Sequence, residues 1–198
     1  MVAYIFDTIL KRAARDTMAL TKRQSRAWFR STASTMTSAN PTRMIRSNSQ
    51  RLTDKPMIGR MYLFNYDPKH KGKLPYYDRF PLVFPFRKTQ DGFIGLNMHY
   101  LPYHLRIALL DKLMVFRSNN RMDETTRLKY SWATIDGISK FNAAIPCVKQ
   151  YLTGHVKTQF RKVSSEDWVT AMMLPVERFV GASKQEVWTE SQRKIRRA

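Results

Sequence analysis

The chain has 198 residues, of which 35 are Lys or Arg and 15 are Asp or Glu, so its formal net charge is +20 at pH 7. Because 43% of the residues are hydrophobic and 12% are aromatic, there is enough apolar material for a core, which excludes wholesale disorder. The single cysteine, Cys147, excludes an internal disulfide framework and a cysteine-based zinc cluster, and it is expected to be a small buried hydrophobic residue.

The positive charge is concentrated at both ends of the chain. Residues 1–51 contain ten Lys or Arg and two Asp, and residues 184–198 contain five basic and two acidic residues. An excess this large repels itself in a folded monomer, so it indicates a partner that neutralises it. Double-stranded DNA is the first such partner to consider, and acidic protein surfaces are the second because guanidinium groups pair with both.

The sequence shows no sign of a membrane partner. No stretch approaches the roughly 20 apolar residues that a spanning helix needs. Residues 1–10 lack an apolar core followed by a small-residue cleavage site, so no secretion signal is expected. The amphipathic, arginine-rich start also fits a mitochondrial transit peptide, and that alternative stays open.

The first part of the chain is predicted to be a basic helical arm and linker over residues 1–51. Residues 3–33 have apolar positions at helical spacing with basic residues elsewhere on the wheel, which indicates one or two amphipathic helices. Residues 31–49 are rich in Ser, Thr and Asn, which is typical of a linker.

The aromatic middle of the chain is predicted to form a small antiparallel sheet interrupted by proline. Residues 60–66 read as a strand that runs into an exposed turn with a basic tip at 69–73. Leu82–Phe86 and Phe93–Met98 are predicted to pair as a hairpin around Asp91-Gly92. This segment contains three prolines, Pro75, Pro81 and Pro85. They exclude a helix and disfavour a central strand, so short edge strands are expected.

The third part is predicted to be mostly helical and bundle-like. Four helices are expected to begin near these residues: Pro102, Asp123, Pro146, and Ser164 or Ser165. The third is expected to reach Phe160 and the last to end at Pro175. The fold class is therefore α+β, with the arm and linker (1–51), a compact domain (52–183) and a basic C-terminal tail (184–198).

The acidic residues do not predict catalysis or a metal site. Nucleases and polymerases need two or more converging carboxylates to hold divalent metals. Most of the Asp residues here stand beside prolines, glycines or turns, where turn and cap geometry explains them. His99 and His104 form the one close histidine pair, and a packing or hydrogen-bonding role is expected for them. No cofactor, no metal and no enzymatic activity are expected.

The positive signal is the interleaving of basic and aromatic residues, which suits phosphate contacts backed by a ring that packs or stacks. The candidate DNA-contacting residues are Lys22, Arg23, Arg26, Trp28, Arg30, Arg43, Arg46, Lys69, Lys71 and Lys73. A basic helix that docks its aromatic edge on its own domain or on an acidic neighbour, and a solvated lysine loop, are the alternatives. Because nothing encodes a reader of base edges, any DNA binding is expected to be independent of sequence.

Several segments have an unusual Pro, Tyr and Phe spacing. They are RMYLFNYDPK from Arg60, LPYYD from Leu74, FPLVFP from Phe80, DGFIGLNMHYLP from Asp91, PCVKQYL from Pro146, and LPVERF from Leu174 followed by Val187 and Trp188. Over about residues 51–190 the chain resembles virion and genome-packaging proteins of T-even-like contractile-tailed phages, with the DNA end protectors as the nearest label. The resemblance implies a protein that binds the terminus of the packaged genome and shields it from host exonuclease.

Charge and resemblance together predict a non-enzymatic virion structural protein that contacts duplex DNA without sequence preference. We expect it in the virion, and in the host cytoplasm during assembly. The main alternative is a neck, tail or baseplate component whose basic surface binds acidic virion proteins. A packaging-associated nuclease is the other, and it would need a carboxylate cluster that the sequence hides.

Overall fold

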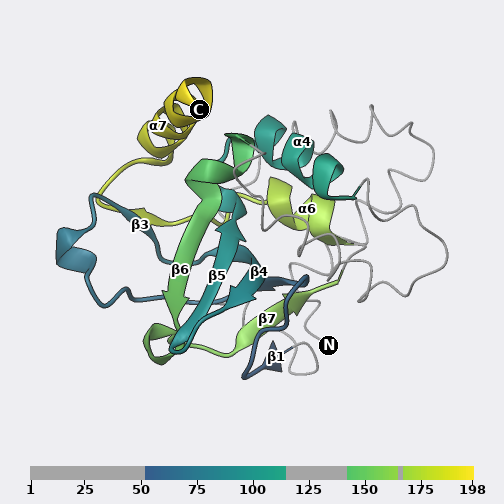
Figure 1. Cartoon of the computed structure of the whole chain (residues 1–198), viewed down its shortest axis with the longest axis vertical. Helices are drawn as coiled ribbons and strands as arrows, with labels where there is room; N and C mark the ends of the chain where they lie inside the picture. Colours follow the sequence, from purple (N-terminus) through teal and green to yellow (C-terminus); the bar gives the residue numbers. More distant parts are fainter. Residues whose placement is uncertain (1–51, 115–141, 165–166) are drawn as a thin grey trace, which may run out of the picture.

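The computed structural model describes residues 52–114, 142–164 and 167–198, and it confirms an α+β fold (Figure 1). The predicted basic arm and linker, and the helix expected near Asp123, lie outside the described residues. Within the described ranges, no helix is long and apolar enough to cross a membrane.

The main sheet has six strands in the order β1-β7-β2-β4-β5-β6, and every neighbouring pair is antiparallel. The strands are β1 (Leu52–Thr53), β2 (Met61–Leu63), β4 (Leu82–Lys88), β5 (Gly92–Asn97), β6 (Val148–Leu152) and β7 (Phe160–Val163). A second sheet pairs β3 (Tyr77–Asp78) with β8 (Phe179–Val180). The antiparallel sheet expected in the aromatic middle is thus present, but it is larger than expected because β6 and β7 join it from later in the chain.

The hairpin predicted around Asp91-Gly92 is confirmed as β4 and β5, which pair from Val83 with Asn97 to Lys88 with Phe93. The turn is closed by the N–H of Thr89, which donates to the carbonyl of Gly92 at 3.0 Å. Gly95 allows the two strands to approach, since a Cβ at that position would lie 2.4 Å from Cγ1 of Val83. Glycine is therefore required at the centre of the hairpin.

The expectation that prolines would confine this region to edge strands is wrong for β4, which lies between β2 and β5. The register shifts between Pro85 and Arg87, so the strand has an irregularity at this point. The carbonyl of Pro85 accepts the N–H of Gly59 at 3.0 Å. The N and C=O groups of one strand residue point to the same side, so the nitrogen of Pro85, which has no hydrogen to donate, also points toward the β2 side. The pairing with β2 has already ended there, because its last pair is Tyr62 with Val83. No ladder hydrogen bond to β2 is therefore lost at Pro85.

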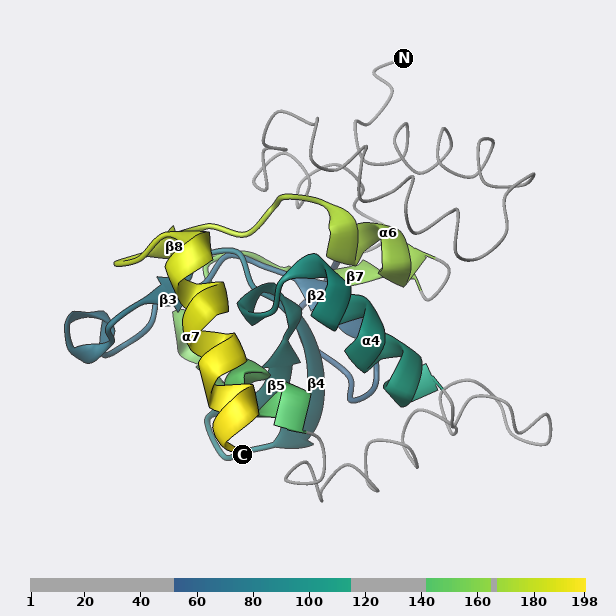
Figure 2. The same ribbon diagram turned by 90° about the horizontal axis from the view of Figure 1, so that it is seen from above.

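The helices pack on one face of the main sheet (Figures 1 and 2). They are α4 (Tyr103–Met114), α6 (Trp168–Met173) and α7 (Lys184–Arg197). The helices expected after Pro102 and before Pro175 are confirmed as α4 and α6, although α6 has Asp167 rather than a serine at its N-cap position. Helix α7 occupies residues that the sequence analysis treated only as a basic tail, and it begins with a capping box between Ser183 and Glu186.

The core shared by sheet and helices follows the alternation of the strands. Met61 and Leu63 of β2 point toward the helices and pack in one cluster with Leu110 of α4 and Trp168 of α6. Cys147 is fully buried in the same cluster, as expected, and burial raises the pKa of its thiol to about 12. It is a packing residue rather than a reactive thiol at neutral pH.

The opposite face of the sheet holds an aromatic cluster. The ring of Phe64 lies 4.9 Å from that of Phe160, 5.4 Å from that of Tyr151 and 6.1 Å from that of Phe93, all edge-on. Phe64 follows β2, and Tyr151 is on β6, three strands away, or roughly 14 Å across a flat sheet. The sheet therefore curls around these rings, which places β6 beside the end of β2.

The prediction of a helix from Pro146 to Phe160 is wrong. Pro146 lies in a 3₁₀ helix, Asn142–Cys147, and the chain then forms β6, a 3₁₀ turn at Thr153–His155 and β7. The apolar spacing of this segment fits a helix locally, but pairing with β5 over five residue pairs determines the outcome. The bundle-like third part is consequently a mixture of strands and helices.

Candidate nucleic-acid interface

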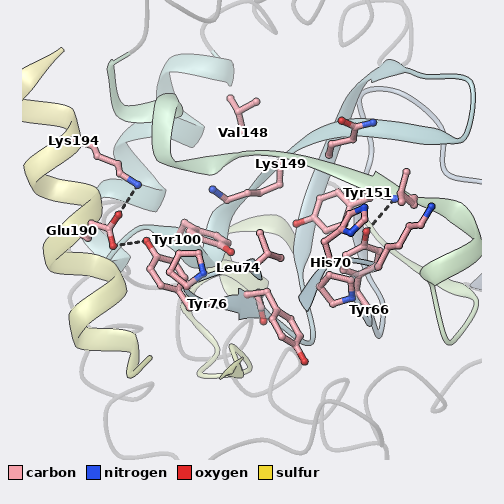
Figure 3. A pocket seen from close by; sticks show the side chains of 17 residues that line it. Tyr66, His70, Leu74, Tyr76, Tyr100, Val148, Lys149, Tyr151, Glu190 and Lys194 are labelled. Carbon is pink, nitrogen blue, oxygen red and sulfur yellow. Dashed lines mark hydrogen bonds and ion pairs between the residues drawn. The ribbon is translucent and has the colours of Figure 1, made fainter. Parts of the chain in front are cut away.

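A pocket of about 620 Å³ lies along β6, the edge strand of the main sheet (Figure 3). Four segments line it: the loop from Tyr66 to Asp78, Tyr100 at the end of the 3₁₀ helix η3 (Met98–Tyr100), the whole of β6, and α7 through Glu190 and Lys194. The loop contains the 3₁₀ turn η2, Lys71–Lys73, which follows the lining residues Lys69 and His70. Pairing of β3 with β8 fixes the end of this loop.

Two tyrosine rings form the centre of the pocket wall. Tyr76 and Tyr100 lie with their ring centroids 6.0 Å apart, and both contact Phe179 of β8 edge-on, at 6.3 and 5.2 Å. Tyr100 is buried and Tyr76 is half-buried. Burial raises the pKa of both phenols, and the carboxylates of Glu190 and Asp78 add to this for Tyr76 and Tyr100 respectively. Both rings therefore stay neutral under physiological conditions.

Lys149 extends from β6 over one of these rings. Its Nζ lies 4.1 Å from the centroid of Tyr100, a cation–π contact (Figure 3). Burial lowers the pKa of Lys149. Among the described residues, no carboxylate lies within ion-pair distance of this amine. Lys149 is thus a half-buried cation whose main partner is an aromatic face.

The α7 side of the pocket carries a bridged carboxylate. Glu190 accepts a hydrogen bond from the hydroxyl of Tyr76 at 2.8 Å and from Nζ of Lys194 at 2.6 Å. The hydrogen bond from Lys194, followed by that from Tyr76, lowers the pKa of Glu190. This bridge holds α7 against the tyrosine wall and neutralises the one acidic side chain of the pocket that is open to solvent.

The lining residues are cationic on balance. They include three lysines, Lys69, Lys149 and Lys194, and two acidic residues, Glu190 and Asp78. Both oxygens of Asp78 are already occupied, since Oδ1 accepts the backbone N–H of Phe80 and Oδ2 accepts Asn97 and His99. The pocket therefore combines aromatic surface with an excess of amines, a combination suited to a ligand that has both a ring and a negative charge.

Three of the predicted DNA-contacting residues lie in the described part of the chain. Lys69, Lys71 and Lys73 are exposed at the predicted basic tip, which forms the turn η2 and its approach. Lys71 is engaged by Asp67, with Nζ 3.0 Å from the carboxylate. Lys69 also lines the pocket, so the loop and the pocket form one continuous surface.

The remaining predicted residues lie outside the described residues: Lys22, Arg23, Arg26, Trp28, Arg30, Arg43 and Arg46. Conversely, the sequence analysis did not single out Tyr76, Tyr100, Lys149 or Glu190. Lys149 was missed because its segment was predicted to be a helix. In a strand, Lys149 and Tyr151 point to the same face, whereas in a helix they do not. The tyrosine-rich segments were visible, but no local pattern links residues 76, 100 and 149.

A second polar cluster lies in the interior. The ring of His99 makes a 2.7 Å contact between Nδ1 and Oδ2 of Asp78, and both side chains are almost fully buried. Asp78 also accepts the N–H of Phe80, two residues on, which is the turn contact expected of an aspartate near a proline. His104, in contrast, is exposed on α4. The hydrogen-bonding role expected for His99 is confirmed, and His99 is not among the residues that line the pocket.

Arg106 of α4 extends this cluster. Its guanidinium donates to the carbonyls of Leu101, Met172 and His99, and it lies 3.6 Å from the carboxylate of Glu177. Burial alone would raise the pKa of Glu177, but Arg106, with smaller effects of His99 and Lys184, holds it below its usual value. Arg106 is fully buried, so this network joins η3 (Met98–Tyr100), α4 and α6 from inside.

Over the ranges that the structure describes, no group of three or more His, Cys, Asp or Glu is placed to hold a metal ion. The buried carboxylates Asp78 and Glu177 are engaged by donors from several elements.

The fold and the pocket define a basic α+β protein with a cationic, tyrosine-lined recess. The sequence model of the family described as "Phage T4 terminal DNA protecting protein" matches residues 1–194, and the chain belongs to this family. The resemblance to T-even-like phage proteins is thereby confirmed, and the match extends into the arm. No curated protein and no solved structure matches the chain.

Proposed function

We propose that this protein binds the ends of linear duplex DNA without sequence preference and shields them from exonuclease, as a non-enzymatic component of the phage particle. The family match over residues 1–194 carries the proposal. The net charge of +20 supports it, because a surface of this sign gains affinity from every phosphate it neutralises.

The described basic residues support binding through the phosphate backbone. Lys69 and Lys73 are exposed on a short loop, and Arg193, Arg196 and Arg197 are exposed at the end of α7. Side chains of this kind reach phosphates and provide affinity, but a lysine on a loop does not read a base sequence. The basic residues of the arm would add to this electrostatic surface.

The state of the carboxylates favours protection over cleavage. A metal-dependent nuclease needs carboxylates that are free to hold cations. In the part of the chain that the structure describes, Asp78 and Glu177 are instead held by buried donors, and Asp67 and Glu190 by lysines. Protection then follows from occupying the end, which keeps an exonuclease from engaging it. A protein with this role would be made in the host cytoplasm and be carried in the virion on the packaged genome.

The experiment compares binding to linear and closed-circular duplex of the same sequence across a salt series, with an exonuclease challenge of the linear form. The expected result is salt-dependent binding, preference for the linear form and survival of its ends. Equal coating of both forms without protection would contradict the proposal. It would favour a neck, tail or baseplate role in which the basic surface meets acidic virion proteins.

The arm gives a sharper prediction. Replacing Arg23, Arg26 and Arg30 with Gln should weaken duplex binding and flatten the dependence of log affinity on log salt by roughly 0.9 for each lost phosphate contact. The matched control replaces three exposed lysines of the described part, Lys55, Lys88 and Lys157, which changes the net charge equally. If both triple variants lose the same slope, net charge rather than the arm determines binding.

A further inference from the structure

A protein that protects DNA ends has to distinguish an end from the interior of a duplex. Phosphates cannot provide this distinction, because they are the same along the whole duplex. The terminal nucleotide can, because it is stacked on one side only and is the easiest to unpair. We infer that the pocket beside β6 takes up the unpaired terminal nucleotide of the DNA, an inference that rests on the proposed function.

The dimensions of the pocket agree with such a ligand. Its volume of about 620 Å³ is within the roughly 300–1,000 Å³ typical of pockets for small organic ligands. A nucleotide in the middle of a duplex is stacked on both sides and paired, so it cannot enter a recess without being unstacked and unpaired, whereas a terminal or unpaired nucleotide turns out of the stack at lower cost. Entry is therefore restricted to ends and to single unpaired nucleotides.

The tyrosine wall provides a surface for the base. Tyr76 is half-buried, and its ring is fixed by edge-on packing against Phe179 and by its hydroxyl contact with Glu190. A ring held in this way loses little freedom when a base stacks on it. Stacking on an aromatic face also tolerates any base, in agreement with binding that is independent of sequence.

The amines provide the contact with the phosphate. Lys149 stands over Tyr100 in the middle of the pocket, with Lys69 at the loop side and Lys194 at the α7 side. Lys149 is half-buried, and the nearby Glu190 acts on it only beyond ion-pair distance. Among the described residues it has no carboxylate in contact, so an entering phosphate would be the first anion to contact it. The attraction is stronger here than at the surface, since less water screens it.

The acidic side chain of the pocket does not oppose this assignment. Glu190 is bound on one oxygen by Lys194 and on the other by Tyr76, so its carboxylate already has two partners at the α7 side of the pocket (Figure 3). Lys73 precedes the lining residue Leu74, and Arg193 precedes the lining residue Lys194; both are exposed and would be available to phosphates of the adjoining duplex. The pocket would thus hold the last nucleotide while its rims hold the backbone.

The test uses the full-length protein and three DNA duplexes of one sequence: blunt-ended, carrying one unpaired nucleotide at each end, and closed into a circle without ends. The wild type should bind the duplex with unpaired nucleotides most tightly, because no base pair has to open, and the closed-circular duplex least tightly. Lys149→Met should reduce the preference for open ends about tenfold, as should Tyr76→Leu, since one base–aromatic contact or one buried phosphate contact is lost.

Lys88→Met is the matched control, because Lys88 is an exposed lysine at the end of β4 that does not line the pocket. It should keep the preference of the wild type. Thermal melting verifies that each variant is folded. If Lys149→Met does not fold, Tyr76→Leu alone tests the pocket assignment. If the wild type prefers and protects open ends but both pocket variants do so equally well, the pocket assignment is wrong and the proposed function stands. If the wild type binds all three duplexes alike and protects none, both are wrong.

Discussion

The buried network around Arg106 and the pocket beside β6 contain the same kinds of side chain, but they engage them differently. In the network, the Arg106 guanidinium has carbonyl partners on Leu101, Met172 and His99 and a carboxylate partner in Glu177. In the pocket, Lys149 has an aromatic face and, within the described ranges, no carboxylate in contact. An interior guanidinium whose three nitrogens each have an acceptor stabilises one arrangement of the chain, whereas a cation left partly partnered is available to a ligand.

The difference follows from how the elements meet. The network lies where η3, α4, α6 and α7 converge, and Trp188 of α7 also donates to the carbonyl of His99, at 2.8 Å. The pocket lies at an edge strand, where the sheet ends and no further strand within the described part covers β6. Helix α7 takes part in both regions, so its capping box at Ser183 contributes to the fold and to the pocket wall.

The comparison is tested most severely by Arg106→Met. The substitution removes three donors and leaves the buried carboxylate of Glu177 with only Lys184, at 3.7 Å, and the hydroxyl of Tyr103 as side-chain partners among the described residues. Breaking a buried pair in this way should reduce the free energy of unfolding by about 3–5 kcal/mol. Urea denaturation measures this change, with Lys88→Met as a surface control that should stay within about 0.5 kcal/mol of the wild type. A loss of less than about 1 kcal/mol would mean that the network does not determine stability.

Glu177→Gln tests the carboxylate of the same network through pH. The native pKa of Glu177 lies below its unfolded value, so the ionised form stabilises the fold fully above about pH 5 and this contribution is lost as the pH falls through the native pKa. At pH 7 the variant should be less stable than the wild type by about 2 kcal/mol. The difference between the two urea midpoints should shrink steadily toward acid pH. A difference that does not change with pH would assign the loss to packing instead of charge.

The elements of the fold differ in how far the sequence predicts them. The β4–β5 hairpin was predictable because its turn residues and its aromatic strands are adjacent in the chain. The start of α7 was also readable, since Ser183 followed by Glu186 has the spacing of a capping box. The segment after Pro146 was not, because its apolar spacing suits either structure and its pairing partner β5 lies some 50 residues earlier.

The polar residues show the same limit. The basic tip at Lys69–Lys73 was predictable because its residues are neighbours in the sequence. Arg106 and Glu177 are 71 positions apart, and Tyr76, Lys149 and Glu190 come from a loop, a strand and a helix that are distant in the sequence. Their function depends on distances that only the curled sheet and α7 create. Local patterns therefore identify exposed basic segments, but they do not show which charges are partnered.

The smallest effect is expected in the loop at residues 69–73, where a partnered lysine and two lysines without an ion pair to described residues can be compared directly. Lys71 is held by Asp67 at 3.0 Å, whereas Lys69 and Lys73 have no ion pair with any described residue. If free amines are the ones that reach DNA, Lys69→Gln and Lys73→Gln should each reduce the salt slope of duplex binding by up to roughly 0.9, and Lys71→Gln should reduce it less. Binding titrations at four or more salt concentrations measure the slopes. Equal slopes for the three variants would show that the Asp67 contact yields to phosphate, since an exposed pair of this kind contributes only about 0–1 kcal/mol.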